Sequence, residues 1–143
     1  MFQKWAAMLG VIIVSVNYRL APEHRLPATY HDVIDALHWI GSMKTESDED
    51  GRVEAEVEVD PWFDSHDDFS KDFVAGGSAG GNIVHHVGVW AASGGNVEIQ
   101  EKGMILMYPY FGGEDWTPSE SLKSPEFNLE QSDVMSRLTL PPG

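Results

Sequence analysis

The stretch "FVAGGSAGGNIVHH", residues 73–86, sets a Gly-x-Ser-x-Gly pattern between two apolar segments of different periodicity. Residues 72–75 form a short apolar run that is typical of a buried strand, and the apolar residues from Ile83 onward recur at helical spacing. A serine at the join of a strand and a helix is the nucleophile-elbow pattern, in which a strained backbone exposes the hydroxyl. The stretch therefore predicts a sharp strand-to-helix turn with Ser78 at its tip.

Each residue type in this turn has a physical reason. Ser78 is the predicted nucleophile, and the close passage of helix and strand leaves little room for side chains at Gly76 and Gly80. The helix N-terminus directs partial positive charge and free N–H groups to the same spot. The backbone N–H of Ala79 is the expected oxyanion-hole donor, and one such donor contributes ~3 kcal/mol to a transition state.

Two other interpretations of the glycines stay open from spacing alone. A glycine-rich turn can simply let a helix pack close to a strand. A dinucleotide-binding loop is the second alternative, but "GGSAGGN" lacks the Gly-x-Gly-x-x-Gly register and a later acidic partner. The nucleophile elbow is favoured over both.

The neighbouring segments alternate between strand and helix patterns. Residues 10–16 and 103–111 are apolar runs that predict buried strands, and residues 28–43 and 130–138 predict helices. The expected buried face of the first helix consists of Val33, Ile34, Leu37, Ile40 and Met43. This order predicts one α/β domain over residues 1–143, with a parallel sheet and helical crossovers.

Composition narrows the function class. The chain has 143 residues, 42% of them hydrophobic, no cysteine and a formal charge of −14. Such a charge argues against nucleic acid and anionic membrane as partners, because the sequence has no basic stripe. Eleven of the acidic residues lie in residues 46–68, which we interpret as a solvated insertion loop. The apolar run after Lys4 imitates a signal peptide but lacks a cleavage site, so we expect a cytoplasmic protein.

The histidines are poorly placed to act as a base for Ser78. His85 and His86 lie two turns along the same helix, roughly 10–12 Å away along its axis, whereas a base must lie within ~3.2 Å. We interpret the remaining histidines as surface or packing residues: His24, His31, His38 and His66. No ligand spacing typical of a metal is present, so we expect neither a metal nor a cofactor.

Charged residues also stand near the first predicted strand and helix. Asp32 and Asp35 are expected on the polar face of the helix over residues 28–43 rather than in acid–base chemistry. Arg19 and Glu23 follow the first strand, and the carboxyl ends of strands are where sites gather in open α/β sheets.

Longer stretches resemble one known family. "VSVNYRLAPEHRLPATYHDVIDALHWI", "DFSKDFVAGGSAGGNIVHH" and "YPYFGGEDWTPSE" are similar to the hormone-sensitive-lipase-like branch of the α/β hydrolases (alpha/beta hydrolase fold-3), and above all to the plant carboxylesterases. The resemblance implies a doubly wound α/β-hydrolase fold. It also implies a serine esterase that forms an acyl-enzyme on Ser78 and takes small-molecule carboxylic esters. By the same resemblance, we expect Arg19 and Glu23 to hold a loop rather than to act in catalysis.

Departures from the family pattern are equally informative. The residue before the nucleophile is usually acidic in this family, whereas Gly77 stands here. The family's His-Gly-Gly-Gly loop belongs before the first residue, and its catalytic aspartate and histidine belong after the last. By the resemblance we therefore expect a fragment, incomplete at both ends and nearly inert alone. The strand that normally separates residues 10–16 from residues 73–75 is also missing, which leaves unpaired strand edges.

Two rival interpretations remain. The same branch contains the gibberellin receptors, which keep the fold and lose catalysis, so a hormone-binding protein is the alternative function. A truncated product without function is the third.

Overall fold

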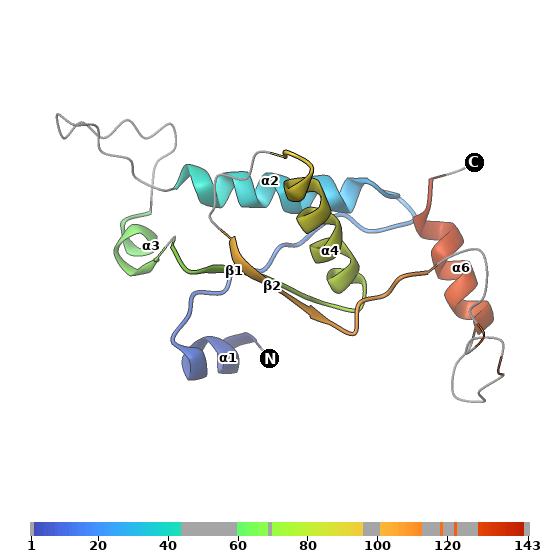
Figure 1. The fold of residues 1–143 in the computed structure, drawn as a ribbon, viewed down its shortest axis with the longest axis horizontal. Coiled ribbons are helices and arrows are strands. Elements are labelled where there is room, and N and C mark those ends of the chain that lie inside the picture. The colour runs from blue at the N-terminus through green and yellow to red at the C-terminus, as the bar shows by residue number, and fades with distance from the viewer. Residues whose placement is uncertain are drawn as a thin grey trace.

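The computed structural model describes residues 2–43, 60–68, 70–95, 101–112, 118, 122 and 129–141. Its elements lie along one long axis, with α3 near one end and α6 at the other (Figure 1). In chain order they are α1 Phe2–Leu9, α2 Ala28–Ser42, α3 Pro61–His66, β1 Asp72–Gly77, α4 Ala79–Ala92, β2 Glu101–Met107 and α6 Leu129–Thr139. No described helix combines the length and apolarity needed to cross a bilayer.

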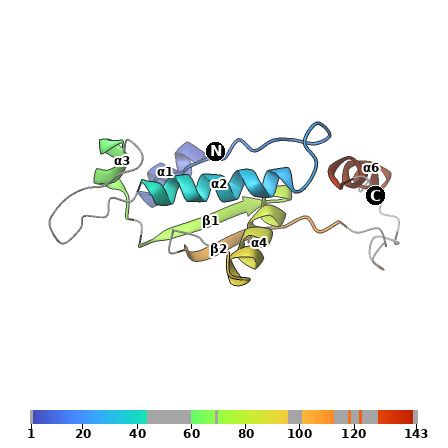
Figure 2. The ribbon, with the colours of Figure 1, turned by 90° about the horizontal axis from the view of Figure 1, so that it is seen from above.

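The sheet of the described chain has two parallel strands, β1 and β2. Their register pairs Phe73 with Gly103 and Gly77 with Met107. Helix α4 follows β1 and contacts both strands, so the unit is strand, helix, parallel strand (Figure 2). Because parallel strands end at the same edge of a sheet, the residues after Gly77 and after Met107 meet there.

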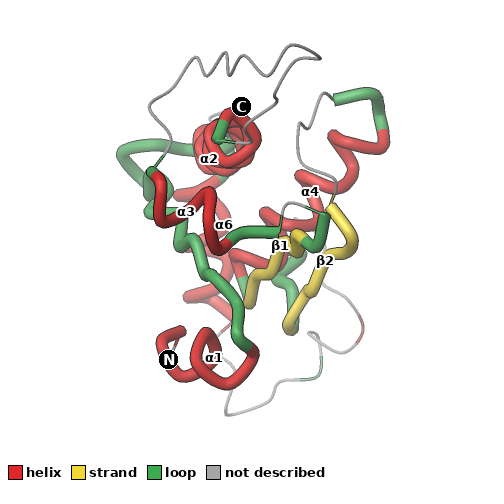
Figure 3. The backbone as a smooth tube through the Cα atoms, turned by 90° about the vertical axis from the view of Figure 1, so that its left-hand side faces the viewer, coloured by secondary structure: helices red, strands yellow, loops and turns green. Residues whose placement is uncertain are grey.

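The core lies between α2 and α4. Val33 and Leu37 of α2 pack against Ile83 and Val87 of α4, and Val87 has no exposed surface. Figure 3 shows the two helices on the same side of the strands. The apolar spacing within each helix thus predicted the buried face, which is confirmed.

Four predicted elements are confirmed by the structure. The helix expected over residues 28–43 is α2, the strand over residues 72–75 is β1, the following helix is α4, and the short C-terminal helix is α6. The strand expected over residues 103–111 is shorter than predicted, because β2 ends at Met107.

The strand predicted over residues 10–16 is wrong. Residues 11–20 contain no strand or helix, and Val11 and Val14 are exposed. Helix α1, which the sequence did not predict, precedes this segment; it ends at Leu9 and is followed by Gly10, whose φ is +64°. Two N–H groups, of Gly10 and of the next residue, donate to the Ala6 carbonyl and close that end.

The interpretation of residues 46–68 as a loop is wrong for its last part. Residues 44–59 lie outside the described residues, but Pro61–His66 form α3. Asp60 caps this helix, since its carboxylate accepts a 2.8 Å hydrogen bond from the Trp62 N–H. Phe63 is buried, which attaches the short helix to the rest of the molecule.

Candidate active site

The junction of β1 and α4 is a sharp turn at Ser78. Ser78 has φ 53° and ψ −118°, and among the described residues only Tyr108 is another non-glycine residue with positive φ. Such a conformation costs of order 1–3 kcal/mol and persists only where the surroundings enforce it. The Ser78 side chain is exposed, does not cap α4 and has no hydrogen-bond partner within the described chain. The predicted strand–turn–helix geometry is therefore present.

Three backbone hydrogen bonds enforce the Ser78 conformation. The Ser78 N–H donates to the Met107 carbonyl at 3.0 Å, which extends the β1–β2 ladder by one residue. The Ser78 carbonyl accepts from the Tyr110 N–H at 3.0 Å and from the Asn82 N–H at 3.2 Å. The Ser78 backbone is thus held on one side by β2 and the residues directly after it, and on the other side by the first turn of α4.

The glycines around Ser78 have unequal roles. A Cβ on Gly76 would lie 2.9 Å from the Gly81 nitrogen and closer still to the carbonyl carbon and oxygen of Gly80, so the predicted steric need for glycine at position 76 is present. The same expectation for Gly80 is wrong, because a Cβ there would meet no described atom within 4 Å apart from the backbone of its own helix and its chain neighbours. Gly81 has the crowded position instead, since its Cβ would lie 2.9 Å from the Pro109 Cα and Cβ.

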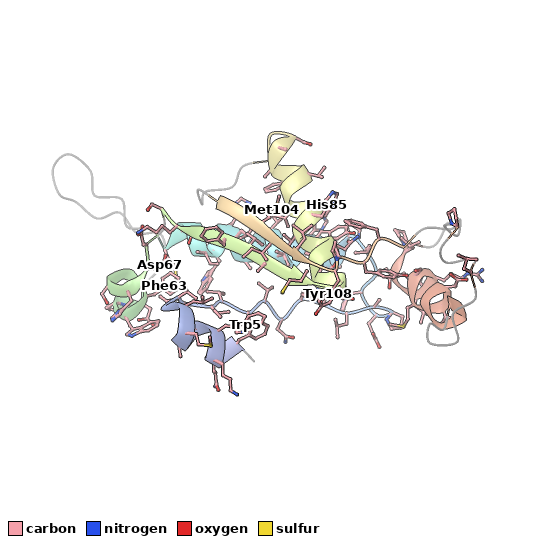
Figure 4. The ribbon with its side chains drawn as sticks, turned by 60° about the horizontal axis from the view of Figure 1, so that its bottom comes forward. Trp5, Phe63, Asp67, His85, Met104 and Tyr108 are labelled. Atoms are coloured by element: carbon pink, nitrogen blue, oxygen red, sulfur yellow. The ribbon has the colours of Figure 1, made fainter. Side chains whose placement is uncertain are left out.

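Gly77 faces the ring of Tyr108. A Cβ on Gly77 would lie 3.4 Å from the Tyr108 Oη, an ordinary van der Waals contact. Tyr108 follows β2 directly and is 80% exposed, near the start of α4 (Figure 4). The position before the serine therefore has room for a Cβ, although this chain has glycine there.

The first turn of α4 leaves backbone donors beside the serine. The first N–H groups of any α-helix have no partner within the helix, and Ala79 is the first residue of α4. Within the described chain, the Ala79 N–H donates to no other backbone group. Because the helix dipole also places partial positive charge here, the surroundings of Ser78 favour a developing negative charge.

The histidines contact aromatic rings rather than the serine. His85 meets Phe111 edge-on at 5.0 Å between ring centroids, and the His86 ring stacks on Tyr30 at 3.8 Å. No described histidine forms a hydrogen bond with Ser78. Burial lowers the pKa of His86, helped by the neighbouring charges of His85 and His31. No three His, Asp or Glu side chains in the described part of the chain are grouped as metal ligands.

Arg19 holds the loop before α2, as the family resemblance implied. Its guanidinium donates to both carboxylate oxygens of Asp32, at 2.6 to 3.1 Å, and its backbone N–H donates to the same carboxylate at 2.8 Å. These hydrogen bonds lower the pKa of Asp32 and raise that of Arg19. The sequence placed Asp32 on the polar face of the helix but did not identify its partner Arg19, which makes Asp32 the anchor of the loop on α2.

The sequence did not single out three residues that support Ser78. Tyr110 supplies one of the two N–H groups on the Ser78 carbonyl, and Asn82 supplies the other. Tyr30 contacts Asn82 from α2, since its hydroxyl donates to Asn82 Oδ1 at 2.9 Å. Asn82 and Tyr110 lie within the motifs "GGSAGGN" and "YPYF", but nothing in the local sequence of Tyr30 indicates a partner 52 residues away.

Comparison with known proteins agrees with this geometry. A family model described as alpha/beta hydrolase fold matches residues 1–142. The chain belongs to this family. Carboxylesterase 20 of Arabidopsis thaliana is 42% identical over 139 residues, which are 94% of this chain and 38% of the relative. A 3-O-acetylpapaveroxine carboxylesterase of Papaver somniferum is 37% identical over 143 residues, 99% of this chain and 43% of that protein.

A solved esterase structure has a similar fold. The hyperthermophilic esterase of Pyrobaculum calidifontis superposes with a TM-score of 0.66 at 26% identity. The match covers 96% of this chain and 40% of the esterase chain. The chain thus spans about two fifths of the length of these relatives, and its α/β-hydrolase fold and carboxylesterase kinship are confirmed.

Proposed function

We propose that this chain carries the nucleophile and one oxyanion-hole donor of a serine carboxylic-ester hydrolase. One observation supports the proposal above all: Ser78 combines positive φ, an exposed position, a hydroxyl without a hydrogen-bond partner among the described residues, and a place directly before the first turn of α4. A plain glycine-rich connector gives no reason to hold a serine in so costly a conformation. The carboxylesterase relatives support small carboxylic esters as the substrate class.

The chemistry follows from these positions. The Ser78 Oγ attacks the carbonyl carbon of the ester while its proton passes to a general base. The Ala79 N–H donates to the resulting oxyanion and contributes ~3 kcal/mol to the transition state. The bond to the alcohol oxygen then breaks, the alcohol leaves with a proton, and water later releases the acid from the acylated serine.

The 143-residue chain alone should turn over esters very slowly. No described histidine hydrogen-bonds to Ser78, and the sequence contains no His-Gly-Gly-Gly. By the resemblance, a complete enzyme uses an aspartate-oriented histidine as the base. Loss of the base costs about 10⁶ in the turnover of subtilisin, an unrelated serine hydrolase.

A chimaera tests the proposal where the chain alone cannot. Residues 1–142 replace the matching segment of Arabidopsis Carboxylesterase 20, so that the host supplies the remaining parts of the fold. We expect this chimaera to hydrolyse p-nitrophenyl acetate and to form an acyl-enzyme that intact mass spectrometry detects. The Ser78→Ala chimaera should lose activity by at least ~10³-fold.

Controls separate folding from chemistry. Circular dichroism must show that both chimaeras fold, and the unmodified 143-residue chain is assayed beside its own Ser78→Ala variant. A folded chimaera without activity, or one whose Ser78→Ala variant keeps it, would refute Ser78 as the nucleophile. Appreciable turnover by the unmodified chain that needs Ser78 would instead overturn the expected inertness.

A further inference from the structure

One side chain of α2 contacts α4 directly behind the serine. The Tyr30 hydroxyl donates to Asn82 Oδ1 at 2.9 Å, and this is the only side-chain hydrogen bond between α2 and α4 within the described residues. The Tyr30 ring also stacks on His86, with 3.8 Å between centroids and 12° between planes. Asn82 and His86 are one helical turn apart, so Tyr30 contacts two successive turns of α4.

Asn82 connects this contact to the serine. Its backbone N–H donates to the Ser78 carbonyl at 3.2 Å, while its side chain accepts from Tyr30. Burial raises the pKa of Tyr30 above its ordinary value of 10.0, so the hydroxyl remains a hydrogen-bond donor at neutral pH. Helix α2 is therefore connected to the Ser78 carbonyl through the Tyr30 hydroxyl and then through the side chain and the backbone N–H of Asn82.

The first turn of a helix is where fraying begins, because its N–H groups lack partners within the helix. At this helix, fraying would release one of the two N–H groups on the Ser78 carbonyl. A residue with positive φ returns to an ordinary conformation once its surroundings no longer enforce the strain. Contacts that hold the first turn of α4 therefore also hold the shape of the candidate site.

We propose that Tyr30 and Asn82 are positioning residues that hold the first turn of α4 so that Ser78 keeps its strained conformation. Their role in catalysis rests on the proposed function of Ser78. Neither residue acts on the substrate. Tyr30 acts through Asn82, and Asn82 acts through the Ser78 carbonyl.

Amide hydrogen exchange of the 143-residue chain, followed by NMR, tests whether Tyr30 and Asn82 hold the first turn of α4 in place. Tyr30→Phe removes the hydroxyl and keeps the ring that stacks on His86. We expect the amides of Asn82 and Tyr110 to exchange about 5-fold faster, which is the loss of one ordinary hydrogen bond. The amide of Val87, in the buried middle of α4, should change much less.

Tyr18→Phe is the matched control. Tyr18 is half-buried against the same core, but its hydroxyl forms no hydrogen bond within the described chain. Asn82→Asp keeps an acceptor for Tyr30 and should retain the protection of the wild type, whereas Asn82→Leu should behave like Tyr30→Phe. Equal effects of Tyr30→Phe and Tyr18→Phe, or a uniform increase that includes Val87, would overturn the proposal.

Stoichiometric labelling connects the geometry to the chemistry. A fluorophosphonate in excess reacts once when the Ser78 Oγ displaces fluoride at phosphorus and loses its proton, and intact mass spectrometry follows the adduct over hours. We expect about 5-fold slower labelling in Tyr30→Phe and an unchanged rate in Tyr18→Phe. Faster exchange with unchanged labelling would refute the positioning role. A wild-type chain without label would count against the nucleophile, while the exchange rates still decide the role of Tyr30.

Discussion

Replacing Gly76 by alanine should damage the fold, although the change adds a single methyl group. The new Cβ would lie 2.9 Å from the Gly81 nitrogen and closer still to the Gly80 carbonyl group. Favourable contacts between carbon atoms begin near ~3.5 Å, so β1 and the start of α4 would have to move apart by more than half an ångström. The atoms in the way belong to the backbone, which cannot rotate aside as a side chain can.

The cost can be worked from these contacts. Overpacking in a close-packed region costs ~1–3 kcal/mol, and rigid backbone neighbours argue for the upper end. With a urea m-value of about 1.5 kcal/mol/M, a loss of ~3 kcal/mol lowers the unfolding midpoint by about 2 M. Urea titration of the wild type and of Gly76→Ala, followed by circular dichroism at 222 nm, measures this shift.

Gly80→Ala is the internal control for that experiment. Its Cβ meets no described atom within 4 Å apart from the backbone of its own helix and its chain neighbours, and alanine is a better helix former than glycine by up to ~1 kcal/mol. We therefore expect Gly80→Ala to be neutral or slightly stabilising, although both glycines belong to the same motif. If Gly76→Ala unfolded at the wild-type midpoint, or if Gly80→Ala were equally harmful, the close approach of β1 and α4 described here would be wrong.

Three further substitutions test separate contacts. His86→Phe keeps an aromatic ring to stack on Tyr30 and removes an imidazole whose pKa the fold lowers. Because the unfolded chain binds a proton at this histidine more readily than the folded chain does, the free energy of unfolding falls as the pH drops below 6.5. The wild-type urea midpoint should therefore drop between pH 8 and pH 5.5 by more than that of His86→Phe. Asp32→Asn should lower the melting temperature more than Asp35→Asn on the same helix, since only Asp32 anchors the preceding loop; equal effects would contradict this. Gly77→Ala should raise stability by ~0.4–1 kcal/mol in urea titration, because its Cβ fits and the unfolded chain loses freedom, and a clear loss would show that the position is crowded.

Local patterns predicted the strand–turn–helix geometry at Ser78 because that geometry is a local matter. The turn at Ser78 follows from a strand that runs directly into a helix, and every residue of that turn lies within a few positions. What supports the turn comes from far along the chain. Tyr30 and Tyr110 are separated from Ser78 by about 48 and 32 residues, and no periodicity indicates which tyrosine contacts a given asparagine or carbonyl.

Two errors came from signals that the sequence did contain. Asp60 before Pro61 is a recognisable helix start, with an N-cap carboxylate and a proline in the first turn, yet the acidic composition favoured a loop. Gly80 was assigned a steric role because the motif is written with two glycines. The structure shows that the motif's spacing and the crowding of its backbone are different properties, since Gly81 rather than Gly80 meets Pro109.

Residues 10–16 show why an apolar run is not yet a strand. Val16, together with Tyr18, packs against the core, so part of this segment finds the apolar contacts that its composition predicts. Burial of apolar side chains has no direction, whereas a strand needs a neighbour that offers N–H and C=O groups in register. In the described chain β1 pairs with β2 alone, so the segment touches the core without joining the sheet. Composition thus specifies which side chains can be buried, and only a hydrogen-bonding neighbour in register makes a segment a strand.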